Sequence, residues 1–135
     1  MQKLLGLGLI AATALAVASG AQAADAKDIR GKWSTWGCNT HWSEISDGTY
    51  ARYTTVQKLP DNLVFKLPAE IVAEDGKLNV GYTYRGIDHK YVYDVENKDK
   101  MMLDQLVMNG NVVFDRSQSN SPYKDRPTLR CAPSA

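Results

Sequence analysis

The chain has 135 residues, with 16 Lys and Arg against 15 Asp and Glu, so its formal charge is close to zero. A nearly neutral chain with interspersed signs offers no basic face, and we therefore expect no nucleic-acid partner. Its length suits one domain with a single modest core.

The first 23 residues have the pattern of an export signal. Lys3 supplies a positive start, residues 4–17 form an apolar core, and Ala21-Gln22-Ala23 fits the small-x-small cleavage rule. The core is too short for a membrane anchor, and no later apolar run could span a bilayer. We expect cleavage near Ala23 and a mature chain, residues 24–135, that acts in the periplasm or is secreted.

Turn signals recur at short intervals along the mature chain, and the segments between them are rich in Val, Tyr, Thr, Phe and Trp. This spacing is typical of an all-β domain. With no linker and no internal repeat, residues 24–135 are predicted to form one domain. The predicted strands are 30–37, 41–46, 49–57, 62–72, 77–84, 89–96, 101–108 and 111–116.

The clearest alternation lies in the segments 77–84 and 89–96. Tyr82 and Tyr84 share one face of the first, and Tyr91 and Tyr93 share one face of the second. A short loop at 85–88 joins them, so we expect a hairpin in which these four rings form one aromatic wall.

Two further local signals concern turns and breaks. Asn109-Gly110 is the strongest hairpin signal in the chain and predicts a type I′ turn. Pro68 interrupts the segment 62–72, because proline cannot donate to a sheet ladder. That segment is therefore an edge strand, a bulged strand or two shorter strands.

The C-terminal part, from residue 117, is rich in Ser, Pro and Asn and is predicted to be an irregular tail. Cys38 and Cys131 are the two cysteines of the chain, and an exported pair is normally oxidised. We therefore predict the disulfide Cys38–Cys131, which would tie the tail to the domain. Closing so long a loop is worth about 4–5 kcal/mol in the chain-entropy model.

About eight sequential strands joined by tight hairpins predict a small antiparallel meander. Closure into a barrel removes the unpaired sheet edges, so a barrel is favoured over the alternative, a β-sandwich.

Gly31-Lys32-Trp33 opens the first predicted strand after a short polar arm, and this triplet resembles the Gly-x-Trp of lipocalins and related calycin barrels. The resemblance implies a lipocalin-like barrel in which Trp33 plugs the closed end and an arginine from the last strand packs across it. Arg116 is the first choice for that arginine and Arg130 the second.

The same features also resemble small exported barrels that inhibit bacterial metalloproteases, which combine a signal peptide, a short arm, Gly-x-Trp and a nearby cysteine. That resemblance implies that the arm Ala24–Asp28 enters the active-site cleft of an enzyme.

The aromatic side chains are the best functional candidates. A group of them could line a pocket for a small ligand, or could simply form the core and cross-strand pairs of the domain. The candidate ligand-binding residues are Trp36, Trp42, Tyr82, Tyr84, Tyr91 and Tyr93.

Signals for catalysis or metal binding are weak. Asp88-His89 beside a turn is typical of a solvated loop, and Cys38 with His41 offers too few ligands for zinc. We predict no catalytic residue, no metal and no cofactor.

These observations favour a non-enzymatic binding protein. We expect it to bind a small apolar or aromatic ligand inside the barrel. The alternative is a periplasmic protein-protein interaction or enzyme-inhibitor module that acts through a rim loop or the N-terminal arm.

Overall fold

The computed structural model describes residues 28–132. The predicted signal, residues 1–23, and most of the arm Ala24–Asp28 lie outside the described residues. The described part is all-β, with two short 3-10 turns at Pro60–Asn62 and Arg116–Gln118. Its strands are β2 (Gly31–Ser34), β3 (His41–Ser46), β4 (Thr49–Thr54), β5 (Leu63–Pro68), β6 (Glu70–Glu74), β7 (Lys77–Tyr84), β8 (Ile87–Asn97), β9 (Lys100–Met108), β10 (Asn111–Asp115) and β11 (Thr128–Arg130).

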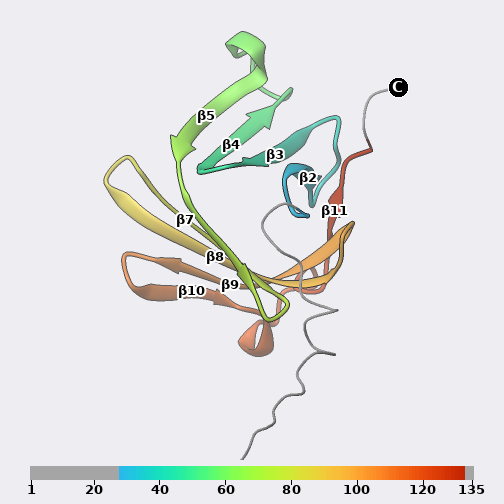
Figure 1. Ribbon diagram of the computed structural model, residues 1–135, viewed down its shortest axis with the longest axis vertical. Helices are drawn as coiled ribbons and strands as arrows, with labels where there is room; N and C mark the ends of the chain where they lie inside the picture. Colours follow the sequence, from blue (N-terminus) through green and yellow to red (C-terminus); the bar gives the residue numbers. More distant parts are fainter. Residues whose placement is uncertain (1–27, 133–135) are drawn as a thin grey trace, which may run out of the picture.

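All strand pairs are antiparallel and belong to one sheet, in the order β5-β4-β3-β2-β11-β9-β8-β7-β6. This sheet curls into a nearly closed barrel, and β10 pairs with β9 outside that path (Figure 1). The predicted antiparallel meander and its closure into a barrel are confirmed.

A bend in the chain connects the two edges of the sheet. β5 and β6 are the two ends of the sheet order, yet they follow one another directly, with Ala69 between them. β5 pairs with β4, β6 pairs with β7, and the Ala69 amide donates to the Gly48 carbonyl at 2.9 Å. Pro68 therefore divides the predicted segment 62–72 into two shorter strands, one of the three alternatives.

The described residues form ten strands where about eight were predicted. One extra strand comes from the division at Pro68. The other is β11, which lies within the segment from 117 that was predicted to be an irregular tail. β11 pairs with β2 on one side and β9 on the other, so three residues of the tail complete the barrel wall.

The disulfide Cys38–Cys131 is present, with 5.8 Å between the two Cα atoms. The Cys131 amide also donates to the Lys32 carbonyl at 2.8 Å, directly after β11. The cross-link thus holds the short strand against β2, and such a bond is typical of an oxidising, extracytoplasmic environment. Within residues 28–132, no helix has the length and apolarity to cross a membrane.

Trp33 is almost completely buried, with 1% of its surface exposed, and its indole Nε1 donates to the Ile29 carbonyl at 2.8 Å. The guanidinium carbon of Arg130 lies 4.5 Å from the centre of the indole. Arg130 also donates to the carbonyls of Arg30, at 2.6 Å, and Asp28.

The first choice for this partner, Arg116, was therefore wrong. Arg116 follows β10, which lies outside the closed path of the sheet, and it binds Asp94 at 3.1 Å and Asp104 at 3.7 Å. The true last strand of the barrel is β11, and Arg130 is its final residue.

The structure also explains why position 31 is a glycine. Its φ is +124°, and a Cβ built there would lie 2.8 Å from Nη1 of Arg130. Only glycine combines this backbone conformation with such a close approach of a neighbouring side chain. The triplet Gly31-Lys32-Trp33 thus leaves room for the arginine that covers the tryptophan.

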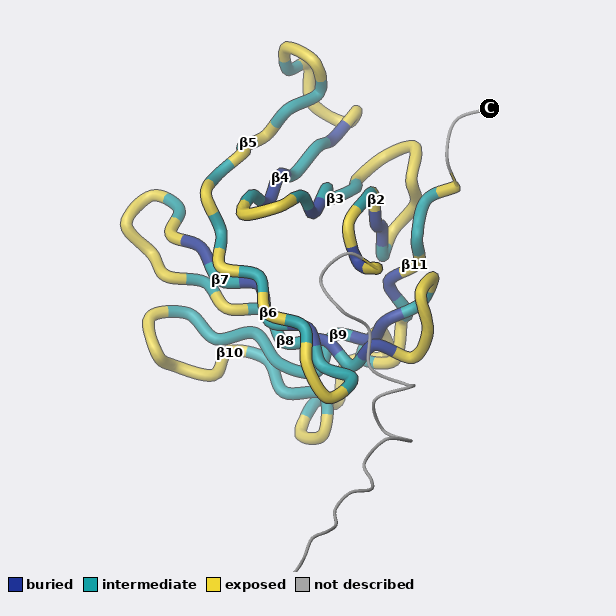
Figure 2. Tube along the Cα trace, viewed as in Figure 1, coloured by how far each residue is buried: buried dark blue, intermediate teal, exposed yellow. Residues whose placement is uncertain are grey.

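The hairpins follow from their turn residues. Asn109 and Gly110 both have positive φ, +49° and +80°, as a type I′ turn requires. Buried positions lie on the strands around the interior, whereas the hairpin tips are exposed (Figure 2). The core consists of Ile29, Trp33, Ile45, Tyr50, Leu78, Val80, Tyr82, Tyr93, Val95 and Met101.

Candidate ligand-binding cavity

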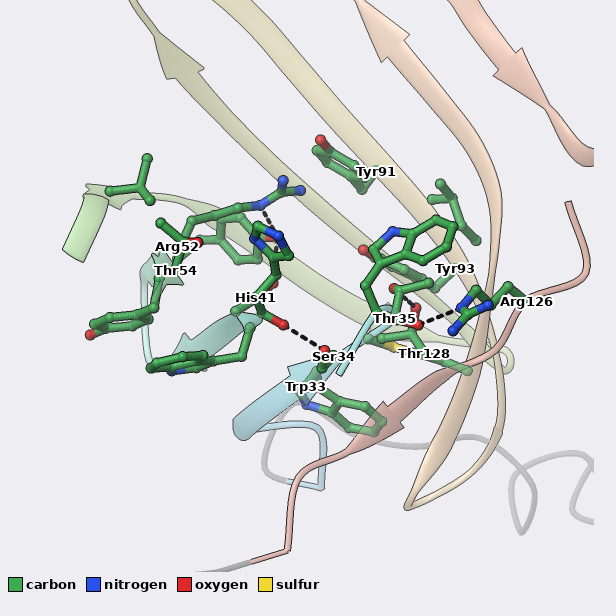
Figure 3. Close-up of a pocket in the computed structure, with 18 of the residues that line it drawn as sticks. Trp33, Ser34, Thr35, His41, Arg52, Thr54, Tyr91, Tyr93, Arg126 and Thr128 are labelled. Carbon is green, nitrogen blue, oxygen red and sulfur yellow. Dashed lines mark hydrogen bonds between the residues drawn. The ribbon is translucent and has the colours of Figure 1, made fainter. Parts of the chain in front are cut away.

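The barrel contains a cavity of about 680 Å³ that is open to solvent on one side. Its walls come from β2, β3, β4, β5, β8, β9 and β10, and from the segment 121–128, which includes the first residue of β11. This volume lies within the range of about 300–1,000 Å³ that is usual for small-molecule sites. Trp33 borders one end of the space (Figure 3).

Stacked tyrosines form one wall of the cavity. Tyr91 and Tyr93 occupy alternate positions of β8, and their ring centres lie 6.2 Å apart with an angle of 12° between the planes. Side chains two residues apart on a strand point to the same face, so both rings face the interior. Tyr50 of β4 lies beyond Tyr91, with 6.5 Å between ring centres.

Four of the six predicted aromatic candidates line the cavity: Trp36, Trp42, Tyr91 and Tyr93. Trp42 also stacks on Tyr53, which is its direct partner on the next strand, at 5.4 Å. The other two candidates, Tyr82 and Tyr84, are not among the lining residues.

The register of the β7–β8 hairpin explains this separation. Tyr82 lies opposite His89 and Tyr84 opposite Ile87, so both are nearer the hairpin tip than Tyr91. Tyr82 is buried and stacks on Tyr50 at 5.2 Å. Tyr84 packs on Phe65, with 4.5 Å between ring centres. These two rings belong to the packed part of the interior beside the cavity.

Arg52 is one of the cavity residues that sequence reasoning missed. It lies on β4 between Tyr50 and Thr54 at two-residue spacing, so all three share the inward face. Its Nε donates to the Tyr50 hydroxyl at 3.1 Å, and its guanidinium carbon lies 5.3 Å from the Tyr91 ring centre. Arg52 reaches across the cavity towards Tyr91 (Figure 3).

The guanidinium of Arg52 is charged inside the barrel. Burial lowers the pKa of this group, but the hydroxyls of Tyr50, Tyr91 and Tyr93 outweigh that effect, and the pKa lies above its ordinary value. The signal in the sequence was the arginine in the alternating stretch Tyr50-Ala51-Arg52-Tyr53-Thr54, at a position in phase with Tyr50.

The charge of the lining residues differs from that of the whole chain. The described residues that line the cavity include three permanent cations, Arg52, Lys124 and Arg126, and neither Asp nor Glu. The chain as a whole carries 15 acidic residues against 16 basic ones. The positive character of the cavity is therefore local.

A cluster of exposed side chains marks one side of the cavity. Trp36 and Tyr123 are 52% and 58% exposed, and their rings meet edge to face at 5.3 Å. Arg126 lies over Trp36, 4.4 Å from the ring centre, and its Nε donates to the Thr35 carbonyl at 2.8 Å. Because these residues both line the cavity and face solvent, we define Trp36, Tyr123 and Arg126 as the mouth cluster.

The other polar candidates have partners within the fold. The Asp88 carboxylate accepts a hydrogen bond from the Thr83 hydroxyl at 2.5 Å, and His89 stacks on Tyr82 at 4.9 Å. No group of three or more potential metal ligands occurs among residues 28–132.

No family model matches this chain, and comparisons with curated proteins and with solved structures find no match either.

Proposed function

We propose that the protein is a non-enzymatic binding protein that holds a small ligand with an apolar or aromatic body inside its barrel. The observation that carries this proposal is the cavity of about 680 Å³, bordered by the rings of Trp33, Phe65, Tyr91 and Tyr93. Such rings offer large apolar faces with few polar atoms, which suits a flat or oily ligand.

We further propose that the protein acts in the periplasm. The first 23 residues have the pattern of an export signal, and the disulfide Cys38–Cys131 supports an oxidising environment. A carrier or sensor of small molecules in that compartment needs an accessible interior, and the mouth cluster supports a route for exchange with solvent.

The neutral, apolar dye Nile red tests the cavity independently of its charge. We expect the wild-type protein to bind the dye saturably, with one dye per chain and a rise in dye fluorescence, because the dye leaves water for an apolar interior. Leu103→Trp should weaken this binding, because Leu103 lines the cavity and a larger ring there takes up part of the space.

Leu129→Trp is the matched control, because Leu129 lies on β11 with 47% of its surface exposed. It should bind the dye like the wild type. Circular dichroism checks that both variants fold, since overpacking at Leu103 costs about 1–3 kcal/mol. Equal dye binding by the two variants would mean that the dye occupies the surface, and the absence of saturable binding by the wild type would contradict the proposal.

A further inference from the structure

The guanidinium of Arg52 has few partners for a charge inside a barrel. Its Nε donates to the Tyr50 hydroxyl at 3.1 Å. Among residues 28–132, no carboxylate forms an ion pair with it, and none accepts a hydrogen bond from its two terminal nitrogens. A guanidinium carries five N–H donors, so most of the donors of Arg52 have no acceptor in the described part of the chain.

Two other partly buried arginines of the described part, Arg116 and Arg130, do have carboxylate partners. Arg116 binds two carboxylates, and Arg130 binds Asp99 as well as backbone carbonyls. An unpaired charge away from bulk water is costly, and folded proteins normally give it a partner. Arg52 has no such partner among the described residues, and the cavity beside it has no acidic lining residue.

We propose that the ligand of this cavity is an organic acid, with an apolar body and one carboxylate that binds to the guanidinium of Arg52. The proposal rests on the proposed function, because it names the chemical class of the ligand for that same cavity.

A carboxylate matches the geometry of the site. Two parallel N–H donors of a guanidinium bind the two oxygens of a carboxylate, and such charge-assisted pairs are the strongest hydrogen bonds of a protein interior. The Tyr50 hydroxyl, which lies 3.1 Å from Ser43 Oγ, can orient the guanidinium or donate to the same oxygen. One guanidinium among rings suits a single negative charge better than a phosphate dianion.

The apolar body would lie along the tyrosine wall. The guanidinium of Arg52 lies over the ring of Tyr91. The ring of Tyr93 stacks next to that of Tyr91, and Trp33 borders one end of the same cavity. The mouth supports the same class of ligand, because Lys124 and Arg126 line the cavity near its exposed side and attract an approaching anion.

The test compares acids with their neutral amides, which have nearly the same shape. Cinnamate with cinnamamide represents an aromatic body, and decanoate with decanamide represents an aliphatic one. Dissociation constants come from competition with Nile red or from calorimetry. We expect the wild type to prefer the acid over its amide by about tenfold or more in at least one pair, as loss of a charge-assisted hydrogen bond predicts.

The Arg52→Gln variant should lose this preference while it keeps its affinity for the amide within about twofold, because only the charge-dependent contact is removed. Arg52→Lys should keep part of the preference, since it retains the charge without the two-pronged geometry. Arg85→Gln is the matched control: Arg85 lies over Tyr84 at the exposed β7–β8 turn, outside the cavity, and the variant should match the wild type.

The outcomes separate the two proposals. Tight binding of acid and amide alike by the wild type would overturn the carboxylate inference and leave the cavity as a neutral binding site. Failure of both acids, both amides and Nile red to bind would overturn the proposed function itself. An acid preference that survives in Arg52→Gln would show that another cation recognises the acid, which also overturns the inference. If Arg52→Gln does not fold, the graded loss in Arg52→Lys decides the question.

Discussion

Two arginines at the inner side of this barrel have opposite roles. Arg130 covers the buried Trp33 and binds the carbonyls of Asp28 and Arg30, so its donors are used within the fold. Arg52 contacts the faces of Tyr50 and Tyr91, and its terminal nitrogens have no acceptor within residues 28–132. The first stabilises the barrel, whereas the second is the residue that we propose binds the ligand.

Alanine substitutions at two glycines test the packing of Arg130 on Trp33. Gly31→Ala should lower the free energy of unfolding by about 1–3 kcal/mol, because a side chain is strained at φ +124° and its Cβ would lie 2.8 Å from Nη1 of Arg130. Gly81→Ala is the matched control: the backbone there has no positive φ, and the nearest atom would lie 3.7 Å away. Urea unfolding measures both variants.

We expect Gly81→Ala to change stability by less than about 1 kcal/mol, since it removes backbone freedom from the unfolded chain without a clash. Equal losses in the two variants would mean that the approach of Arg130 to Gly31 has no energetic consequence.

At the scale of elements, the β7–β8 hairpin carries four tyrosines, and β11 connects β2 to β9 within the sheet. Strand positions were predictable because hydrophobic alternation and turn residues are local signals: β3 begins and ends where predicted, and Asn109-Gly110 forms its turn. β11 was not, because a three-residue strand carries almost no periodicity. Its place between β2 and β9 depends on long-range pairing and on the bond from Cys131 to Cys38.

The candidate site was predictable only in part, for a similar reason. The sequence marks which rings share a face of a strand, and so it pointed to Tyr91 and Tyr93. It does not show how far two strands are offset, and that offset places Tyr82 and Tyr84 beside the cavity instead of around it. The choice of Arg116 failed because β10, although a strand, is not part of the closed path.

Because of two buried tyrosines of the β7–β8 hairpin, we expect the free energy of unfolding to fall at alkaline pH. Burial is the main cause that raises the pKa of both Tyr82 and Tyr93 above its ordinary value. The folded state thus keeps protons that the unfolded state releases above about pH 10. The resulting stabilisation is complete below that pH, and it falls as the pH rises towards the folded pKa values.

Urea unfolding between about pH 8 and pH 11 measures this effect on the free energy of unfolding. This range brackets the ordinary tyrosine pKa of about 10. Tyr93→Phe should make the loss at high pH shallower, because one buried hydroxyl no longer contributes. Tyr123→Phe, at an exposed position, is the matched control and should keep the wild-type slope. A wild-type stability that does not fall across this range would refute the role assigned to the buried tyrosines.

At the scale of the whole molecule, the chain forms a barrel whose interior is only partly filled. The core packs around Trp33, Leu78 and Val80, and the cavity occupies the space beside it. The net charge is nearly zero, yet the cavity lining has three cations and no acidic side chain among the described residues. This contrast supports the proposal that the cavity binds an organic acid.

Native mass spectrometry of the protein purified from its own cells tests the central claim, that the barrel holds a small organic molecule. The spectrum should show one added mass per chain, which disappears when the protein is unfolded in acid and organic solvent. The released compound should be an apolar molecule, and on the carboxylate inference it should ionise as an acid. A spectrum that shows only bare protein, together with no saturable binding of Nile red, cinnamate or decanoate, would contradict the account.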